Sequence, residues 1–550
     1  MAARHGAGLY VLSDPYDEDN LENQELFGDS GPIPPEVALY DREAQSVVFI
    51  GGSSERFAQI NALPGAGPQS KTKIPVYEYI WRFGRAADDE LPDRAGLSAL
   101  AEAMIWQGVH DDANWSTASS NIPAGYTYLG QFIAHELSRF VDPINEADPA
   151  SINSPSLDLD SIYRHPRIQR NGIELAIGST DQGRMEDLPR DAAGKPEISD
   201  PRNDDNLPLA QTHVAFLKFH NRAARLMMKG GHKLDVDDVK FEVVKHFQSI
   251  VLHDYAKRII QSEIYEDVCQ NGRRIVYPKG EYPASKTDFK LPIEFAAAAF
   301  RFGHSMVRES YEKWNGQNNG GLDVFWAKTH NSSRDPKPIV LDDLWVNIWE
   351  RLLCFKGTRW ADRQSDQDPI MASPIDDHLA FGLGQIREEA LPISNAEPRF
   401  TSNNLAARTL DRALTLRLKS AQDVIRKINH EVGGSTPPIP LLHDWQLFEA
   451  ERPCVQRAAS HRYGWPRSIV RHTPLWFYIL KEAQILGDGG NTLGPLGSRI
   501  VMESIHSAIQ FSRISILNDN QEVDWRPRLE FAPNEKHIYT FPDMIMFIGE

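Results

Sequence analysis

The amino-acid sequence predicts a mainly α protein, built as one large helical domain with long loops and little β structure. The chain has 550 residues, of which 41% are hydrophobic, and this is enough for a sizeable core. Apolar residues recur every three to four positions along several long segments, as they do on one face of an α-helix. Strand-like alternation is sparse, and the sequence shows no repeat of 20–50 residues.

Residues 1–77 differ from the rest of the chain. They are rich in proline, glycine and acidic residues and have weak periodicity, so we predict an irregular N-terminal arm. The one strand signal in this arm is the short run Ser46–Ile50, which ends at Gly51 and Gly52. Residues 78–550 form the predicted helical domain, and no obvious linker divides them.

Helical signals dominate from about residue 78 onward. Asn206 is a good cap and precedes a long amphipathic segment. The segments with helical spacing are, in chain order, Gly125–Phe140, Leu207–Met228, Val239–Ile260, Pro292–Val307, Asn404–Ile425, Leu475–Ile485 and Pro495–Ile509. Long polar connections such as Glu309–Pro338 and His430–His443 separate some of them.

The composition excludes several functional classes. With 59 basic and 76 acidic residues the formal charge is −17, which argues against a nucleic-acid-binding surface and against binding to anionic membranes by charge alone. Three cysteines (Cys269, Cys354 and Cys454) exclude a disulfide scaffold and any CxxC motif. No signal-peptide pattern and no long apolar window are found. We therefore expect a cytoplasmic protein without a membrane span, while export by a non-standard route stays open.

Dinucleotide, P-loop, nucleophile-elbow and HExxH zinc motifs are absent from the sequence, and two histidine segments stand out instead. In GYTYLGQFIAHELSRF, Gln131 and His135 lie four residues apart, so an imidazole and an amide share one helix face. In AAAAFRFGHSMVRE, four alanines precede Arg301 and His304 and leave room for close helix packing or for a bulky cofactor. Taken singly, each histidine is more often a structural or surface residue.

Together with three further segments, these two resemble one known family. Ile122–Pro143 resembles the distal-histidine helix of the animal-type heme peroxidases, the peroxidase–cyclooxygenase superfamily, and Ala298–Glu309 resembles their proximal-histidine helix. Asp200–Arg222 resembles the segment with the family's catalytic arginine and its HNR signature. Thr473–Ala483 and Leu493–Glu503 are similar to its C-terminal helices. The motifs keep the family's chain order, so the chain is identified as a bacterial-like member.

The resemblance implies a heme enzyme that uses hydrogen peroxide to oxidise an unidentified substrate through a ferryl intermediate. His304 would be the proximal iron ligand, which leaves the other axial side of the iron open. His135 would move the peroxide proton as a general acid–base group, and Arg202 would supply positive charge where the O–O bond polarises. Gln131 would hold a distal water or a halide, and Arg301 would pair with a heme propionate.

Several positions depart from the family's pattern. Ala134 stands where members carry an ester-forming aspartate, and Asp205 matches the second ester carboxylate with one methylene less. Asn206 replaces a sulfonium-forming methionine, so the resemblance implies a b-type heme with at most one ester link, through Asp205. Thr409 stands where an asparagine usually orients the proximal histidine, and Arg412 matches a propionate-binding arginine. These changes indicate a specialised or attenuated member.

A calcium loop is also expected. Oxygen-bearing side chains alternate along SPSLDLDSIY, at Ser154, Ser156, Asp158 and Asp160. Such side chains would fall on one side of an extended segment and suit Ca²⁺, although a solvated acidic turn has the same pattern. The resemblance adds Glu136, the neighbour of His135, as a fifth protein ligand, so the loop would fix the distal helix.

The leading hypothesis is a heme peroxidase whose substrates are hydrogen peroxide and an unknown reducing compound. The alternative is a heme-binding sensor or scaffold without turnover, which Ala134 and Thr409 motivate and the pair of His135 and Arg202 opposes. A specialised biosynthetic heme oxygenase on the same scaffold also stays open. Cyclooxygenases and fatty-acid dioxygenases of the superfamily carry a radical tyrosine three residues before the proximal histidine. This chain has Arg301 there, so that activity is disfavoured.

Overall fold

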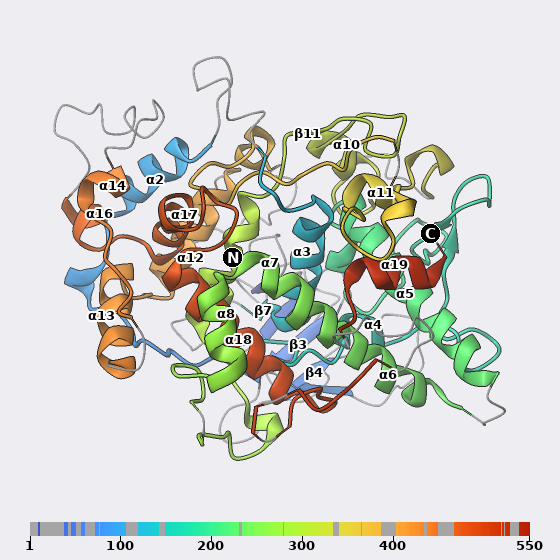
Figure 1. Cartoon of the computed structure of the whole chain (residues 1–550), viewed down its shortest axis with the longest axis horizontal. Coiled ribbons are helices and arrows are strands. Elements are labelled where there is room, and N and C mark those ends of the chain that lie inside the picture. Colours follow the sequence, from blue (N-terminus) through green and yellow to red (C-terminus); the bar gives the residue numbers. More distant parts are fainter. Residues whose placement is uncertain are drawn as a thin grey trace, which may run out of the picture.

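The computed structural model describes most of the chain from residue 77 onward, and the backbone of five short strands before it (Figure 1). The described residues of the main part are 77–105, 119–141, 149–229, 234–278, 280–333, 340–364, 366–386, 403–433, 437–448, 467–518, 520–521, 523–527 and 538–549. Cys454 and parts of the long polar connections lie outside these ranges.

Helices make up most of the regular structure, and the prediction of a mainly α fold is confirmed. The α-helices are α2 (Arg94–Ala103), α3 (Gly125–Leu137), α4 (Asp160–Tyr163), α5 (Leu207–Met228), α6 (Val236–Ser249), α7 (Lys257–Ile259), α8 (Ser262–Asn271), α9 (Ile293–Ala297), α10 (Leu322–Ala327), α11 (Trp349–Leu352), α12 (Leu405–Thr415), α13 (Ala421–Val432), α14 (Asp444–Phe448), α16 (Arg467–Arg471), α17 (Leu475–Leu486), α18 (Pro495–Gln510) and α19 (Phe541–Ile548). Two 3₁₀ segments matter for the site, η4 (Pro201–Asp204) and η7 (Ala299–His304).

The N-terminal arm contains more β structure than the sequence predicts. Five strands pair in chain order as an antiparallel sheet: β1 (Leu9–Val11), β2 (Ala38–Asp41), β3 (Ser46–Ile50), β4 (Phe57–Ile60) and β5 (Thr72–Pro75). The register sets Tyr40 opposite Val47 and Val48 opposite Ile60. The prediction of an irregular arm is therefore wrong for these segments, because strands of three to five residues are too short to show clear alternation. The expected strand at residues 46–50 is present as β3.

The remaining strands are two-residue pairings within the helical domain. β6 (Tyr77–Glu78), β8 (Ala150–Ser151) and β7 (Phe140–Val141) form a three-stranded sheet in that order. Two further pairs are β9 (Gly178–Ser179) with β10 (Glu186–Asp187), and β11 (Ser310–Tyr311) with β12 (Gly320–Gly321).

Two of the predicted helices are broken in the structure. The segment 292–307 divides at Ala298, whose φ of −136° and ψ of −69° are not helical, so α9 is followed by the 3₁₀ segment η7. The segment 404–425 divides into α12 and α13, because Arg417 adopts a φ of 55°. The Arg417 side chain donates to the carbonyl of Ala86, so a contact distant in the sequence accompanies the break.

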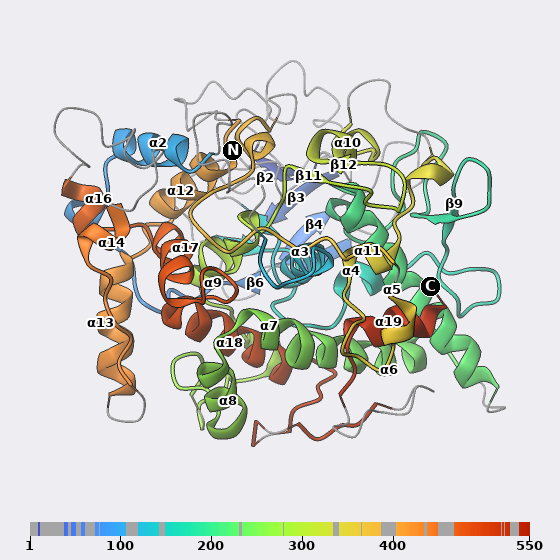
Figure 2. The same cartoon turned by 45° about the horizontal axis from the view of Figure 1, so that its top comes forward.

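Helix α3 lies close to the middle of the molecule. Figure 2 shows it almost end-on, with α17 and α18 on one side and α5, α6 and α19 on the other. Phe132 of α3 stacks on Phe216 of α5 at 4.6 Å between ring centroids, and the edge of Phe247 of α6 closes the cluster at 6.0 Å. Gly130 allows close approach on another face, since a Cβ atom there would lie 2.4 Å from the Tyr255 hydroxyl. These contacts fix the rotation of α3 about its axis.

Within the described segments, no helix combines the length and the apolar character that crossing a bilayer requires.

Candidate active site

Helix α3 presents one face that is less enclosed than the others. Gln131 and Ala134 are half-buried, whereas the residues of α3 on the other faces are buried. His135 belongs to this same face and is 7% exposed. The sequence predicts this juxtaposition of an amide and an imidazole from their spacing, and the structure places them so.

The ring of His135 is held by a buried amide. Its Nδ1 lies 2.8 Å from Oδ1 of Asn203, and Nδ2 of Asn203 lies 2.9 Å from Nδ1 of His213 on α5. Burial lowers the pKa of His213 to about 3, so this imidazole is neutral. Sequence reasoning missed Asn203 and His213. A signal was available in part, since Asn203 directly follows the predicted catalytic arginine.

Arg202 lies beside the end of α3. Its Nη1 donates to the carbonyl of Ser138 and its Nη2 to the carbonyl of His135, at 2.9 and 2.8 Å. The guanidinium also forms a bidentate ion pair with Asp200, with N–O distances of 2.6 and 2.9 Å. Arg202 holds the pKa of Asp200 well below its usual range against the opposing effect of burial. The arginine therefore ties η4 to the end of α3, and its charge is paired.

The other predicted distal residues lie around the same face. Oε1 of Gln131 accepts a hydrogen bond of 3.0 Å from Nδ2 of Asn206, which leaves the amide nitrogen of Gln131 as the group that can donate. Asp205 is the half-buried C-cap of η4, next to Asn206. Ala134 carries no polar group, so α3 offers no ester-forming carboxylate at this position.

His304 is presented by a 3₁₀ segment and not by an α-helix. Arg301, Gly303 and His304 are half-buried, while Ala299 and Phe302 of the same segment are buried. The edge of the His304 ring meets Trp476 of α17 at 5.9 Å between centroids. A Cβ atom placed on Gly303 would meet no atom within 4 Å, so there is open space beside His304. Segment η7 contacts α3 directly.

Two predicted propionate-binding arginines converge on one aromatic ring. The guanidinium carbons of Arg301 and Arg412 lie 5.8 and 4.9 Å from the ring centroid of Phe140, which follows α3 in the chain. Arg301 reaches this position from η7 and Arg412 from α12. The hydroxyl of Thr409, also on α12, donates to the carbonyl of Leu405 at 2.9 Å, which leaves its oxygen lone pairs as acceptors.

The predicted calcium residues gather beside α3, although not on one extended segment. Asp160 begins α4 after Leu159, whose φ is 57°, so the extended segment ends before Asp160. Glu136 is fully buried and accepts hydrogen bonds from the backbone N–H groups of Asp160 and Ser161. Burial and the nearby Asp160 charge raise the pKa of Glu136 to about 8. Asp160 also bonds Ser154 and Arg164, and Asp158 accepts from two backbone N–H groups of residues 513 and 514.

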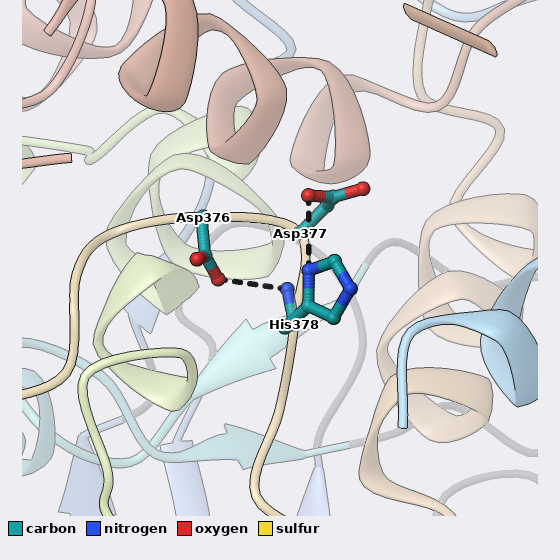
Figure 3. Close-up of side chains that lie close together, drawn as sticks. All are labelled: Asp376, Asp377 and His378. Carbon is teal, nitrogen blue, oxygen red and sulfur yellow. Dashed lines mark hydrogen bonds and ion pairs between the residues drawn. The ribbon is translucent and has the colours of Figure 1, made fainter. Parts of the chain in front are cut away.

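A second buried polar cluster lies on the proximal side. Among the described residues, Asp376, Asp377 and His378 are the one set of three potential metal-binding side chains whose ligand atoms lie within 4.8 Å of one another (Figure 3). The calcium carboxylates are thus not this close together. Lys481 of α17 lies 3.2 Å from Asp377, and both side chains are at most 1% exposed. An ammonium group bound to this carboxylate opposes a metal cation, so the cluster is an internal ion-pair network.

The HNR signature has a structural role. Nδ1 of His220 lies 2.8 Å from the hydroxyl of Tyr163 in α4. The Asn221 side chain accepts from the N–H of Leu175 and donates to its carbonyl, at 2.7 and 2.9 Å. These bonds fasten the loop around Leu175 and helix α4 to α5.

The chemistry of these side chains fits a heme group. Two imidazoles come from contacting elements, open space adjoins one of them, and two guanidinium groups converge at the edge, where a pair of carboxylates can bind. His304, Arg301 and Arg412 would hold the group, with Gln131 and His135 facing it from α3. Asp200, Asn203 and His213 form an outer layer that the sequence analysis did not identify.

Comparisons with known proteins agree with this assignment. The model of the animal haem peroxidase family matches residues 167–383. Among solved structures, peroxidase A from Dictyostelium discoideum superposes with a TM-score of 0.53 at 15% sequence identity, over 88% of this chain and 96% of that chain. Fatty acid α-dioxygenase from Oryza sativa superposes with a TM-score of 0.51 at 11% identity, over 84% of this chain and 77% of that chain. No curated protein sequence matches.

The two solved structures show that this chain has the same fold as they do. The family match goes further for residues 167–383, whose sequence matches the family itself. That segment holds Arg202, Asp205, Arg301 and His304, while His135 and Arg412 lie outside it. The match to this family supports heme binding by an oxidoreductase. Residues 167–383 therefore match the animal haem peroxidase family, and this match and the shared fold together support membership of the peroxidase–cyclooxygenase superfamily.

Proposed function

We propose that the protein is a heme-dependent peroxidase that uses hydrogen peroxide to oxidise a second substrate. The observation that supports this proposal is that His135 on α3 and His304 on η7 come from two elements in direct contact, each of which has a half-buried face. Heme, when bound, supplies the iron at which peroxide is cleaved and the oxidising equivalents for the substrate. The protein then has to hold that group, leave one side open and move one proton.

Each step of the protein's work has a candidate side chain. His304 would bind the iron through a neutral imidazole nitrogen. His135 would take a proton from the incoming peroxide and return it to the leaving oxygen. Arg301 and Arg412 would pair with the propionates, and their convergence on Phe140 supports this role.

Attachment of the heme by an ester rests on one carboxylate. Asp205 is the half-buried candidate, at the end of η4. Ala134 offers no carboxylate from α3, so at most one ester link forms. Mass spectrometry of heme extracted with acidic solvent tests this: free heme in the solvent means that no link exists.

Calcium binding beside α3 belongs to the same proposal. Glu136 and Asp158 are buried carboxylates whose pKa burial raises, and Asp160, which is paired with Arg164, lies beside them. Oxygen ligands of this kind suit Ca²⁺. Binding would require the Asp160 carboxylate to exchange its contact with Arg164 for the ion, because the three carboxylates do not yet surround one point.

The second candidate function is heme binding with attenuated or no turnover. The ion pair of Arg202 with Asp200 favours this second function. A guanidinium whose charge is balanced by a carboxylate stabilises negative charge on peroxide less than an unpaired guanidinium would. A dioxygenase acting through a tyrosine three residues before His304 is not favoured, since Arg301 occupies that position. Oxidation of a phenolic dye, compared with that by free hemin, separates the two candidates.

The decisive experiment compares His135→Ala with His430→Ala, a change at an exposed histidine of α13. Both variants should keep the Soret absorption band of bound heme. The reaction with hydrogen peroxide, followed by stopped-flow absorption, should slow by roughly 10²-fold or more in His135→Ala alone, since general acid–base transfer is typically worth this much. Equal rates in the two variants would remove the proposed role of His135.

A further inference from the structure

His135 is the first of three buried side chains that hydrogen bonds join in a row. Asn203, the third residue of η4, is 0% exposed and bridges two imidazoles. Its Oδ1 faces Nδ1 of His135 at 2.8 Å, and its Nδ2 faces Nδ1 of His213 at 2.9 Å. Both distances are those of well-formed hydrogen bonds. His213 comes from α5, so three separate elements meet at this amide.

The orientation of the amide determines which nitrogen of His135 carries hydrogen. An amide oxygen only accepts and an amide nitrogen only donates. Nδ1 of His135 must therefore donate to Oδ1, and a neutral imidazole that is protonated at Nδ1 has an unprotonated Nε2. Nε2 is then the nitrogen that can accept a proton from peroxide.

We infer that Asn203 and His213 are positioning residues that hold His135 in this tautomer, with hydrogen at Nδ1 and the basic lone pair at Nε2. The role of Nε2 toward peroxide rests on the proposed function, whereas the tautomer itself does not. Neither residue touches the substrate. They act through His135, as the partner of a catalytic histidine does in other enzymes.

His213 is suited to fixing the amide because it stays neutral. Its low pKa, caused by burial, keeps a lone pair on Nδ1 for the Asn203 N–H group over the whole working range of pH. A charged His213 would carry hydrogen at Nδ1 and would need an acceptor opposite it. The Asn203 amide would then turn so that Oδ1 faces His213 and Nδ2 faces His135. The ring is also held by Phe132 of α3, edge-on at 6.0 Å.

His213 also lines a small cavity. This cavity of about 10 Å³ is lined by His213, Ile162, Leu217 and Glu197, among others, and has room for one water molecule. A neutral His213 that accepts at Nδ1 carries its hydrogen at Nε2, and a water molecule in this cavity can accept it. Such a water molecule would give the Nε2–H group of His213 its hydrogen-bond acceptor.

The test uses three variants and a control. Asn203→Leu removes the acceptor for His135, and His213→Leu removes the group that orients Asn203. His213→Gln restores a carbonyl oxygen that can accept from Asn203, so it is the conservative variant. Asn271→Leu alters an exposed amide of α8 and serves as the control.

The first measurement is ¹⁵N NMR of histidine-labelled, cofactor-free protein, with the His135 signals identified by their loss in His135→Gln. The wild-type protein, the control and His213→Gln should show His135 protonated at Nδ1 and bare at Nε2. Asn203→Leu and His213→Leu should show a mixture of tautomers. An Nε2-protonated His135 in the wild-type protein, or a tautomer unchanged in both leucine variants, would overturn the inference.

The second measurement is the rate of reaction of the heme-loaded protein with hydrogen peroxide. We expect a decrease of roughly 10- to 100-fold in Asn203→Leu, a smaller one in His213→Leu, and near-normal rates in His213→Gln. Because NMR needs neither heme nor peroxide, failure of the proposed function leaves the tautomer result readable. A leucine variant that does not fold leaves the other leucine variant to decide.

Discussion

The two sides of the candidate site are built in different ways. The distal side, formed by α3, η4 and α5, consists of side chains joined by hydrogen bonds, from Arg202 with Asp200 to His135 with Asn203. The proximal side, formed by η7, α12 and α17, holds His304 on a short 3₁₀ segment against the edge of Trp476. This difference matches the role proposed for each histidine. Proton transfer by His135 requires a defined tautomer, whereas iron ligation by His304 requires only that its ring is held in position.

Both sides nevertheless contain a buried ion pair next to the segment that carries the histidine. On the proximal side, the hydroxyl of Ser305, the neighbour of His304, accepts from the N–H of Asp376 at 3.3 Å. The adjacent Asp377 is paired with the fully buried Lys481. On the distal side, Arg202 and Asp200 form the corresponding buried pair. The two pairs differ in one respect, because lysine can lose its proton and arginine cannot.

The largest expected effect separates the two histidines. His304→Ala should abolish or greatly perturb the Soret band, because it removes the proposed iron ligand, while His135→Ala should retain it. Absorption spectra of both variants after reconstitution with hemin, at matched protein concentrations, give the comparison. Equal retention of heme by both would mean that His304 is not the ligand. Circular dichroism checks that both variants are folded.

The helix period explains why the distal side could be predicted from the sequence in large part. Gln131 and His135 share a face by spacing alone, and α3 and α5 begin at the expected residues. The proximal helix was expected to be continuous, but its break at Ala298 depends on packing against α17 and α18 that no local pattern encodes. Asn203 and His213, ten residues apart in the chain, meet only because η4 folds back on α5.

The next effect compares the two buried ion pairs. Asp200→Asn should lower the free energy of unfolding by about 3–5 kcal/mol, since it leaves the Arg202 charge buried without its carboxylate. In Asp377→Asn, Lys481 can become neutral, so the cost at about pH 9 should not exceed about 2 kcal/mol, the free energy of deprotonating an ordinary lysine there. Urea unfolding at about pH 7 and pH 9 measures both. If Asp377→Asn lowered the free energy of unfolding by more than about 2 kcal/mol at about pH 9, the proposed difference between the lysine pair and the arginine pair would be wrong.

Calcium would stabilise the distal side alone. At a free Ca²⁺ concentration 100 times the dissociation constant, binding should add about 2.7 kcal/mol to the free energy of unfolding. Thermal unfolding with added Ca²⁺ and with a chelator should therefore differ in the wild-type protein and not in Asp158→Asn. The variant keeps an acceptor oxygen for the backbone N–H groups of residues 513 and 514. A wild-type protein that does not respond to Ca²⁺ would show that Glu136 and its neighbours serve only as helix caps.

The smallest effect belongs to a buried carboxyl group on the proximal side. Glu482 of α17 caps α18 through the backbone N–H groups of Leu496 and Gly497, and burial raises its pKa to about 8. Between its ordinary pKa of about 4.5 and this value, the folded protein holds a proton that the unfolded chain has lost, so stability falls as pH rises. Replacing the group by a neutral amide in Glu482→Gln removes this contribution. The free energy of unfolding of the variant, relative to the wild-type protein, should therefore rise by about 1.4 kcal/mol per pH unit within that window. Urea unfolding at several pH values measures the slope, with Glu102→Gln on the exposed face of α2 as the control. If the pH dependence were the same in Glu482→Gln and in the control, Glu482 would be ionised in the folded protein. The hydrogen bonds from the two backbone N–H groups would then lower its pKa more than burial raises it.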